Sequence, residues 1–268
     1  MAGRGSPPPS TSASTLVTVL PRLLAAAPLL VAAALGAQPA PAKKPGTFEG
    51  SASLGFSQTR GNADATTTNV ANKLKYTLAG WQVQQDLTFF YGEASNKVNA
   101  NFWSGGLRAQ RRLHPRLGSY LVGRFDRNVL QGISRRFEEG VGLDVTALST
   151  KAQTLNLAFG ASRFQQTLTP GSRTSFRGSF PAARAALDFR HKFSPSATFQ
   201  QTAEYLPNLS ESSAYLVNTE STIVAPLMSK LAVKIAYVIR YNNAPPVRNN
   251  VPLRTTDTFF SSGVTYSF

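Results

Sequence analysis

The residues that could carry out chemistry in this sequence are few. Its 268 residues contain two histidines, His114 and His191, and no cysteine. Without cysteine there can be no thiol nucleophile, thiolate-bound metal or disulfide. His114 precedes a proline in a short turn, and neither histidine stands with the fixed nucleophile that a hydrolytic triad needs. We therefore expect both to be solvated turn residues, and the sequence indicates no catalytic, cofactor-binding or metal-binding residue.

Two further patterns favour structure over chemistry. Gly140 and Gly142 are spaced like part of a phosphate-binding loop, but no helical pattern follows them. In a strand, the two glycines would leave space on the inward face. Glu138 and Glu139 are adjacent carboxylates, and adjacent residues of a strand point to opposite faces. They cannot act as a pair, so any function depends on how the strands arrange the charges.

The strands are indicated by a period of two that dominates the chain after its N-terminal segment. In residues 47–58, Phe48, Leu54 and Phe56 fall on one face, and three serines and a glutamate fall on the other. The same alternation recurs in about twelve segments, each near the 9 to 11 residues with which a tilted strand crosses a bilayer. Each segment therefore has one apolar face and one polar face.

The connections and the aromatic residues favour a membrane barrel over a water-soluble sandwich. Short turns, such as residues 79–80, alternate with longer polar loops, such as residues 242–254, which is typical of outer-membrane barrels. Aromatic residues on the apolar faces gather near strand ends, as Trp81, Tyr91 and Tyr241 do. Because lipid offers no partner for the amides of an edge strand, the sheet must close. The sequence predicts an all-β fold, a closed antiparallel transmembrane β-barrel of about 12 strands.

The N-terminal segment has the pattern of a secretory signal peptide. Two arginines and an apolar run over residues 23–35 are followed by small residues. A membrane anchor is the alternative, but about 15 apolar residues with a proline among them fall short of the roughly 20 that a spanning helix needs. We therefore expect a cleaved signal peptide at residues 1–37, a flexible lead-in at 38–46 and a barrel at 47–268, exported to a Gram-negative outer membrane.

Three segments of the chain resemble a known family. They are GSASLGFSQTRGNADATT at residues 50–67, FEEGVGLDV at 137–145 and GVTYSF at 263–268. Together they are similar to a domain-of-unknown-function family of salt-induced outer membrane proteins. The resemblance covers nearly the whole predicted barrel and implies its fold and location. It implies no reaction, substrate or site, because the family label carries none.

The end of the sequence also resembles outer-membrane barrels as a class. Such barrels commonly close with a strand that finishes in an aromatic residue, and the barrel-assembly machinery reads that strand. The resemblance therefore implies an assembly signal, formed by Phe260, Val264, Tyr266 and Phe268.

The chain is strongly basic, with 28 Lys and Arg against 13 Asp and Glu. This excess suggests either nucleic-acid binding or an anion pore, and sorting the charges by strand parity tests both. The inward faces carry nearly balanced charges, which favours ion pairs across a narrow interior over the positive ring of an anion pore. The charged residues that we expect to face the lumen are Lys73, Asp86, Arg108, Arg124, Asp126, Glu138, Asp144, Arg184, Glu204, Glu220, Lys234 and Arg240.

The remaining positive charge is expected at the two ends of the barrel. The long loops are predicted to carry Arg60, Lys97, Arg135, Arg136 and Arg248 among others. A solvated rim and a contact with lipopolysaccharide phosphates are both compatible with these residues. Because the basic residues are divided between two ends, they form no continuous patch, and nucleic-acid binding is not expected.

These observations favour a narrow passive channel for ions or small polar solutes, lined by the inward charges. Twelve strands fall between the eight that side chains can fill and the sixteen that leave an aqueous channel. The alternative is a non-conducting barrel that supports the envelope under salt or osmotic stress. An outer-membrane lipid-modifying enzyme is a minor alternative. The expected partners are outer-membrane lipids, including lipopolysaccharide, and the assembly machinery, and the expected state is a monomer without cofactor.

Overall fold

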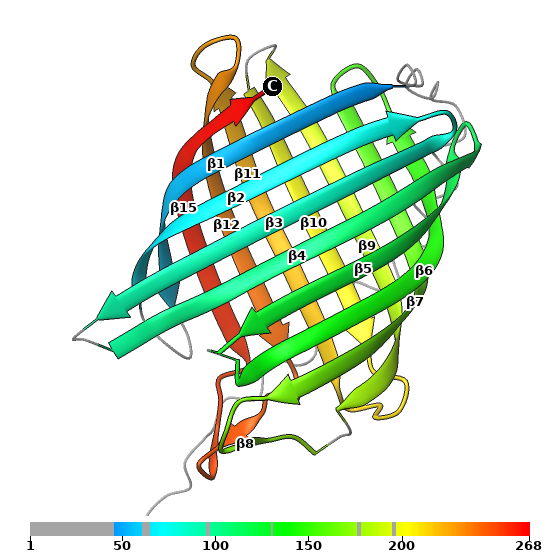
Figure 1. Cartoon of the computed structure of the whole chain (residues 1–268). Helices are drawn as coiled ribbons and strands as arrows, with labels where there is room; N and C mark the ends of the chain where they lie inside the picture. The colour runs from blue at the N-terminus through cyan, green and yellow to red at the C-terminus, as the bar shows by residue number, and fades with distance from the viewer. Residues whose placement is uncertain (1–45, 61–64, 95–96, 130, 176–177, 195–196) are drawn as a thin grey trace, which may run out of the picture. The chain divides into compact units, whose positions relative to one another are not determined.

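The computed structural model is a closed antiparallel β-barrel (Figure 1). It describes residues 46–60, 65–94, 97–129, 131–175, 178–194 and 197–268. The predicted signal peptide at 1–37 and the lead-in up to residue 45 lie outside the described residues. The wall consists of β1 (Thr47–Arg60), β2 (Ala65–Leu78), β3 (Trp81–Ala94), β4 (Lys97–His114), β5 (Leu117–Asn128), β6 (Ile133–Ser149), β7 (Gln153–Leu168), β9 (Ser179–Ser194), β10 (Ala197–Pro207), β11 (Tyr215–Pro226), β12 (Leu231–Asn242) and β15 (Thr256–Ser267).

The ring closes where the first strand of the wall meets the last. Strands β1 and β15 pair in antiparallel register from Ser51 opposite Ser267 to Arg60 opposite Thr258. Each of the remaining wall strands pairs with the wall strand that precedes it and with the one that follows it in the sequence. Closure gives partners to amides that lipid would leave unpaired. The predicted fold class, a closed antiparallel barrel of about 12 strands, is confirmed.

The two faces of the wall follow the period of two in the sequence. Large apolar side chains point outward, and Leu54 and Val264 are 66% and 43% exposed. Residues that alternate with such side chains point inward, and Asp257 and Thr265 on β15 are 1% and 8% exposed. The outer surface is therefore apolar, whereas most of the polar side chains of the wall enclose a lumen.

Outward-facing aromatic residues lie near both ends of the wall. Tyr205, Tyr215 and Tyr241 contact one another where β10, β11 and β12 approach the long loops, with ring centroids 5.6 and 5.7 Å apart along the row. Trp81 begins β3 at the short-turn end and is also exposed. This arrangement matches the aromatic girdles with which membrane barrels meet the two interfaces.

The strands are longer than the sequence analysis predicted. They range from 11 residues in β10 to 18 residues in β4. The additional length on β6 and β7 lies toward the long loops, where the outer face changes from apolar to charged at Arg135 and Arg163. This part of the wall does not need lipid contact, so an estimate based on bilayer thickness alone omits it.

A small sheet in the long loops was also not predicted. It consists of β8 (Ser172–Arg173), β13 (Val247–Arg248) and β14 (Val251–Pro252), with β13 in the centre. Strands of two residues are too short to show a periodicity of their own. Within the described residues, no helix has the length and the apolar character that crossing a bilayer requires.

The closing strand is held by Phe268 on the outer face. The N–H of Phe268 donates to the carbonyl of Gly50 at 3.0 Å, and the N–H of Gly50 donates back to the carbonyl of Phe268 at 3.0 Å. The ring of Phe268 lies over Gly50, where a Cβ atom would overlap it, and its centroid is 6.1 Å from that of Phe48. The missing side chain at Gly50 therefore provides the space that the terminal ring occupies.

We predict that Gly50→Val destabilises the barrel by about 1 to 3 kcal/mol, because the new side chain must displace the Phe268 ring. The temperature at which the folded band is lost in detergent gel electrophoresis measures this effect. The control is Gly123→Val, because a Cβ atom at Gly123 would have no neighbour within 4 Å. Equal losses in the two variants would show that the contact between Gly50 and Phe268 does not hold the closing strands together.

Candidate functional site: the charged lumen

The main cavity inside the barrel has a volume of about 1030 Å³. At the short-turn end it is lined by Gly80, Trp81 and Pro115, and toward the long loops it reaches the level of Arg136 and Arg240. A second cavity of about 130 Å³ lies along β1, β2, β12 and β15. No residue of the long loops, as far as the structure describes them, lines either cavity.

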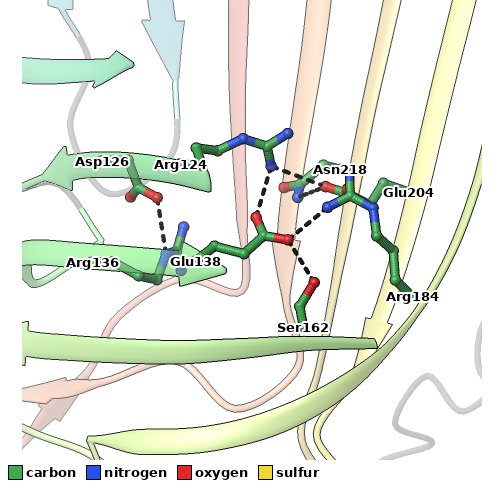
Figure 2. Close-up of polar contacts among 8 residues, drawn as sticks. All are labelled: Arg124, Asp126, Arg136, Glu138, Ser162, Arg184, Glu204 and Asn218. Carbon is green, nitrogen blue, oxygen red and sulfur yellow. Dashed lines mark hydrogen bonds and ion pairs between the residues drawn. The ribbon is translucent and has the colours of Figure 1, made fainter. Parts of the chain in front are cut away.

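Four charged residues in the middle of the lumen form a network that we call the crossbar. It consists of Arg124 on β5, Glu138 on β6, Arg184 on β9 and Glu204 on β10 (Figure 2). Each arginine contacts both glutamates. Arg124 Nη1 lies 3.1 Å from Glu138 Oε2 and 3.5 Å from Glu204 Oε2. Arg184 Nη1 lies 2.6 Å from Glu138 Oε1, and its Nη2 pairs with Glu204.

The crossbar extends into the lumen instead of following the wall. Strands β5 and β10 are separated in the wall by β6, β7 and β9. With about 4.8 Å between neighbouring strands, these two strands are roughly 19 Å apart along the wall. Arg124 nevertheless reaches Glu204 within 3.5 Å. The two side chains must therefore extend into the interior to meet, and the crossbar occupies part of the section of the lumen at its level.

Glu138, Arg184 and Glu204 are nearly removed from water, whereas the side chain of Arg124 is 31% exposed to the lumen, so the buried atoms of the first three need partners. The side chain of Glu138 is 2% exposed. The Ser162 hydroxyl donates to Glu138 Oε1 at 2.9 Å, and the Asn218 amide donates to Glu204 Oε2 at 3.1 Å (Figure 2). Buried charges are tolerated when they are paired and hydrogen-bonded in this way. Two arginines and two glutamates also leave the crossbar with no net charge.

Glycines beside the acidic residues make room for the charged side chains. A Cβ atom at Gly106 would lie 2.8 Å from the carboxylate of Asp86, and one at Gly118 would lie 2.7 Å from that of Asp144. Gly142 leaves space for the hydroxyl of Tyr120. These inward glycines therefore have a packing role in the lumen.

Further ion pairs flank the crossbar on both sides. Toward the long loops, Arg136 Nε donates to Asp126 Oδ1 at 3.0 Å. Toward the short turns, Arg108 lies over the ring of Tyr120 at 3.8 Å, and its Nη2 is 3.8 Å from Asp144 Oδ1. The lumen is thus lined by alternating charges over much of its length.

Each charged residue that we expected in the lumen lines one of the two cavities. The main cavity is lined by Lys73, Asp86, Arg108, Arg124, Asp126, Glu138, Asp144, Arg184, Glu204, Glu220 and Arg240. The smaller cavity is lined by Lys73, Glu220, Lys234 and Arg240. Lys234 Nζ lies 3.5 Å from Glu220 Oε1, which places a further ion pair near the second cavity. The residues of the expected assembly signal, Phe260, Val264, Tyr266 and Phe268, all point outward and are 42 to 49% exposed.

Four of the expected loop residues lie in strands of the wall, namely Arg60 at the end of β1, Lys97 at the start of β4, and Arg135 and Arg136 in β6. Arg136 is not a loop residue, because β6 already begins at Ile133 and Arg136 shares the inward face with Glu138. Arg248 lies in the loop sheet, where its Nη2 donates to the carbonyl of Val129 at 2.6 Å. Neither guanidinium is therefore free for the contact with lipopolysaccharide that the sequence left open.

A group of inward-facing aromatic residues was not predicted from the sequence. Near the long loops, Phe102 and Phe259 are 1% and 3% exposed inside the barrel. Each has an aromatic neighbour in the sequence, Trp103 and Phe260, that is exposed on the outer face. Two consecutive aromatic residues in a strand must point to opposite faces, and this signal could have identified the inward ones.

Neither histidine is the turn residue that we expected, because both lie in strands of the wall. His114 ends β4 and His191 lies near the end of β9, both beside short turns. His191 Nδ1 is 3.3 Å from the amide of Gln153 and its ring contacts Phe193. Among the residues that the structure describes, no group of three His, Asp or Glu side chains could hold a metal ion.

We predict that Glu138→Gln destabilises the barrel by about 3 kcal/mol, because it leaves the buried charge of Arg184 and the charge of Arg124 undercompensated. The midpoint of urea unfolding in lipid vesicles, followed by tryptophan fluorescence, measures the change. Glu139→Gln is the control, since Glu139 is exposed on the outer face, and it should change the free energy of unfolding by less than about 0.5 kcal/mol. Similar midpoints for the two variants would contradict the crossbar.

Known structures share this fold at low sequence identity. The NanC porin is 8% identical with a TM-score of 0.53, covering 82% of this chain and 99% of its own. An outer membrane channel from Pseudomonas putida F1 is 9% identical with a TM-score of 0.50, covering 87% and 98%. These likenesses show the fold alone, and no curated protein matches the chain. A family described as "Protein of unknown function, DUF481" matches residues 52–268, and the chain therefore belongs to this family.

Proposed function

We propose that the protein is a narrow passive channel of the bacterial outer membrane for ions or small polar solutes. In this proposal a cleaved signal peptide at residues 1–37 directs its export, and the short turns face the periplasm, as in other outer-membrane barrels. The main observation in favour is a cavity of about 1030 Å³ that is lined by charged and polar side chains and reaches the short turns. A lumen of this composition can replace part of the hydration of a passing ion.

The alternation of charges supports a pore with little preference between cations and anions. The crossbar carries two positive and two negative charges. Arg136 is paired with Asp126, and Arg108 lies near Asp144. An ion of either sign would therefore meet fixed charges of both signs along its path, in contrast to the single-sign rings of strongly selective channels.

A non-conducting barrel that supports the envelope under salt or osmotic stress is the second candidate. The crossbar favours it, because side chains that meet across the lumen reduce the open section. Buried ion pairs of this kind can fix a structure without serving transport. A lipid-modifying enzyme remains a minor candidate, and the solitary positions of His114 and His191 provide little support for it.

The outer wall near the long loops suits a contact with phosphorylated lipid headgroups. Arg135 and Arg163 lie on the outward faces of β6 and β7, and both are exposed. Arg135 Nε donates to the hydroxyl of Thr167 at 3.1 Å, which holds its guanidinium beside β7. Arginine binds phosphate through charge-assisted hydrogen bonds. We therefore propose lipopolysaccharide phosphates as ligands of this outer surface, with Arg136 and Arg248 taking no part.

We predict stepwise ionic currents when the refolded protein is inserted into a planar bilayer. The control is the same preparation after boiling, which should insert no channels. Repeated absence of current steps at every salt concentration, with the folded band intact on the gel, would rule out the channel and favour the supporting barrel.

We predict that Arg135→Gln with Arg163→Gln weakens binding to vesicles that contain lipid A, because the arginines lose their contacts with phosphate. Binding is measured by co-flotation of the refolded, detergent-solubilised protein with the vesicles. The matched control is Arg173→Gln in the loop sheet. Equal binding to vesicles of lipid A and of its dephosphorylated form would contradict the proposed phosphate contact.

A further inference from the structure

Three phenylalanines meet inside the barrel between the cavities and the long loops. The ring centroids of Phe90 and Phe102 are 5.5 Å apart, those of Phe90 and Phe259 are 5.9 Å apart, and those of Phe102 and Phe259 are 6.1 Å apart. Phe102 and Phe259 are among the most buried residues of the described chain. We refer to these three residues as the aromatic layer. Aromatic pairs at such distances attract one another beyond the burial of their surface.

The aromatic layer extends into the lumen like the crossbar, but on the other side of the barrel. Phe259 belongs to β15 and Phe102 to β4, and β1, β2 and β3 lie between these strands in the wall. Four steps of about 4.8 Å separate the strands by roughly 19 Å along the wall. Their rings are nevertheless 6.1 Å apart. The rings therefore meet inside the barrel and fill the part of the lumen that β15, β1, β2, β3 and β4 enclose.

Arg240 fixes the aromatic layer from a third direction. Its guanidinium lies 4.5 Å from the ring centroid of Phe102 and 5.8 Å from that of Phe259. Arg240 belongs to β12, and its side chain extends through the interior to Phe102 on β4, past the strands that lie between them in the wall. A cation over two ring faces holds the rings in position. Arg240 also lines both cavities, which places it at their boundary with the layer.

The opposite part of the wall is apolar at the same end of the barrel. Phe164 on β7, Phe180 on β9 and Leu206 on β10 form a buried cluster. The rings of Phe164 and Phe180 stack with centroids 5.2 Å apart. Arg136 lies 6.0 Å from the Phe164 ring and brings its charge next to this cluster. The polar lining of the lumen is thus interrupted near the long loops by apolar side chains from both halves of the wall.

We propose that the aromatic layer, clamped by Arg240, is the constriction that determines which solutes cross the barrel, and that the crossbar is not. This inference rests on the proposed channel function and adds its selectivity-determining residues. The crossbar lies within the main cavity, whose lining continues past it to Arg136 and Arg240. The aromatic layer borders only the smaller cavity. Solutes that cross would be small ions that pass an apolar constriction at the cost of part of their hydration.

The physical reason is that rings and charges resist an ion differently. Charged side chains of a crossbar can exchange partners with a passing ion, because they replace lost water contacts. Phenyl rings provide no such replacement, and a narrow apolar constriction excludes water when its rings are in contact. In this proposal an ion meets its largest barrier at the level of the long-loop end where the aromatic layer faces the apolar cluster of Phe164 and Leu206.

The first experiment compares matched pairs of phenylalanines in planar bilayers. Phe102→Ala with Phe259→Ala removes the contact across the lumen. The control is Phe89→Ala with Phe159→Ala, which removes two phenylalanines that are exposed on the outer face of β3 and β7. We expect the inward double variant to conduct with steps about twofold or more above those of the wild type. The outward double variant should match the wild type.

The results separate this inference from the proposed channel function. A silent wild type with a conducting inward variant would support the aromatic layer as the barrier and remove the claim that the native barrel is a channel. A conducting wild type whose steps equal those of the inward variant would overturn the layer as the constriction. Silence of both proteins, each with a folded band on the gel, would overturn both proposals.

If the alanine variant does not fold, a second double variant and a second measurement still test the proposal. Phe102→Leu with Phe259→Leu keeps the sites apolar and should give an intermediate conductance. Ser104→Cys places a thiol next to the layer on the main cavity, and the native chain has no other cysteine. A charged, membrane-impermeant maleimide added on the long-loop side should label Cys at this position much faster in the leucine background. Equal labelling rates with and without the Phe substitutions would overturn the proposal.

Discussion

Lipid cannot form hydrogen bonds with an open strand edge, and the rest of this structure depends on that constraint. The sheet satisfies it by pairing β1 with β15, and the closed ring divides every strand into an outer and an inner face. Because charged groups are costly in lipid, most of the charges of the wall strands lie on the inner face. The polar lumen is therefore a direct consequence of closing an alternating sequence into a ring.

The width of the ring determines what the inner side chains do. Twelve strands enclose more space than side chains of one wall can fill, but long side chains from strands four places apart in the wall still meet. Arg124 and Glu204 meet in the crossbar, and Phe102 and Phe259 meet in the aromatic layer. The first contact is polar and can coexist with water, whereas the second excludes it. Because of this difference, we propose the aromatic layer as the barrier of the passage.

Much of the wall could be predicted from the sequence, because a period of two is a local property. Parity alone placed Glu138 inward and Phe260 outward, as the structure has them. Arg136 was assigned wrongly because the start of β6 was placed too late, and a boundary error turns an inward residue into a loop residue. The crossbar and the aromatic layer could not be derived, since their partners depend on the stagger and diameter of the whole ring. Single residues carry no information on which strand will face them across the lumen.

The reversal potential of the refolded protein in a tenfold gradient of potassium chloride tests the central claim most directly. A lumen lined by alternating charges, with a crossbar of zero net charge, should discriminate weakly between potassium and chloride. We predict ionic current with a reversal potential close to zero. A reversal potential near the Nernst value of either ion, or a folded barrel that carries no current, would contradict the account.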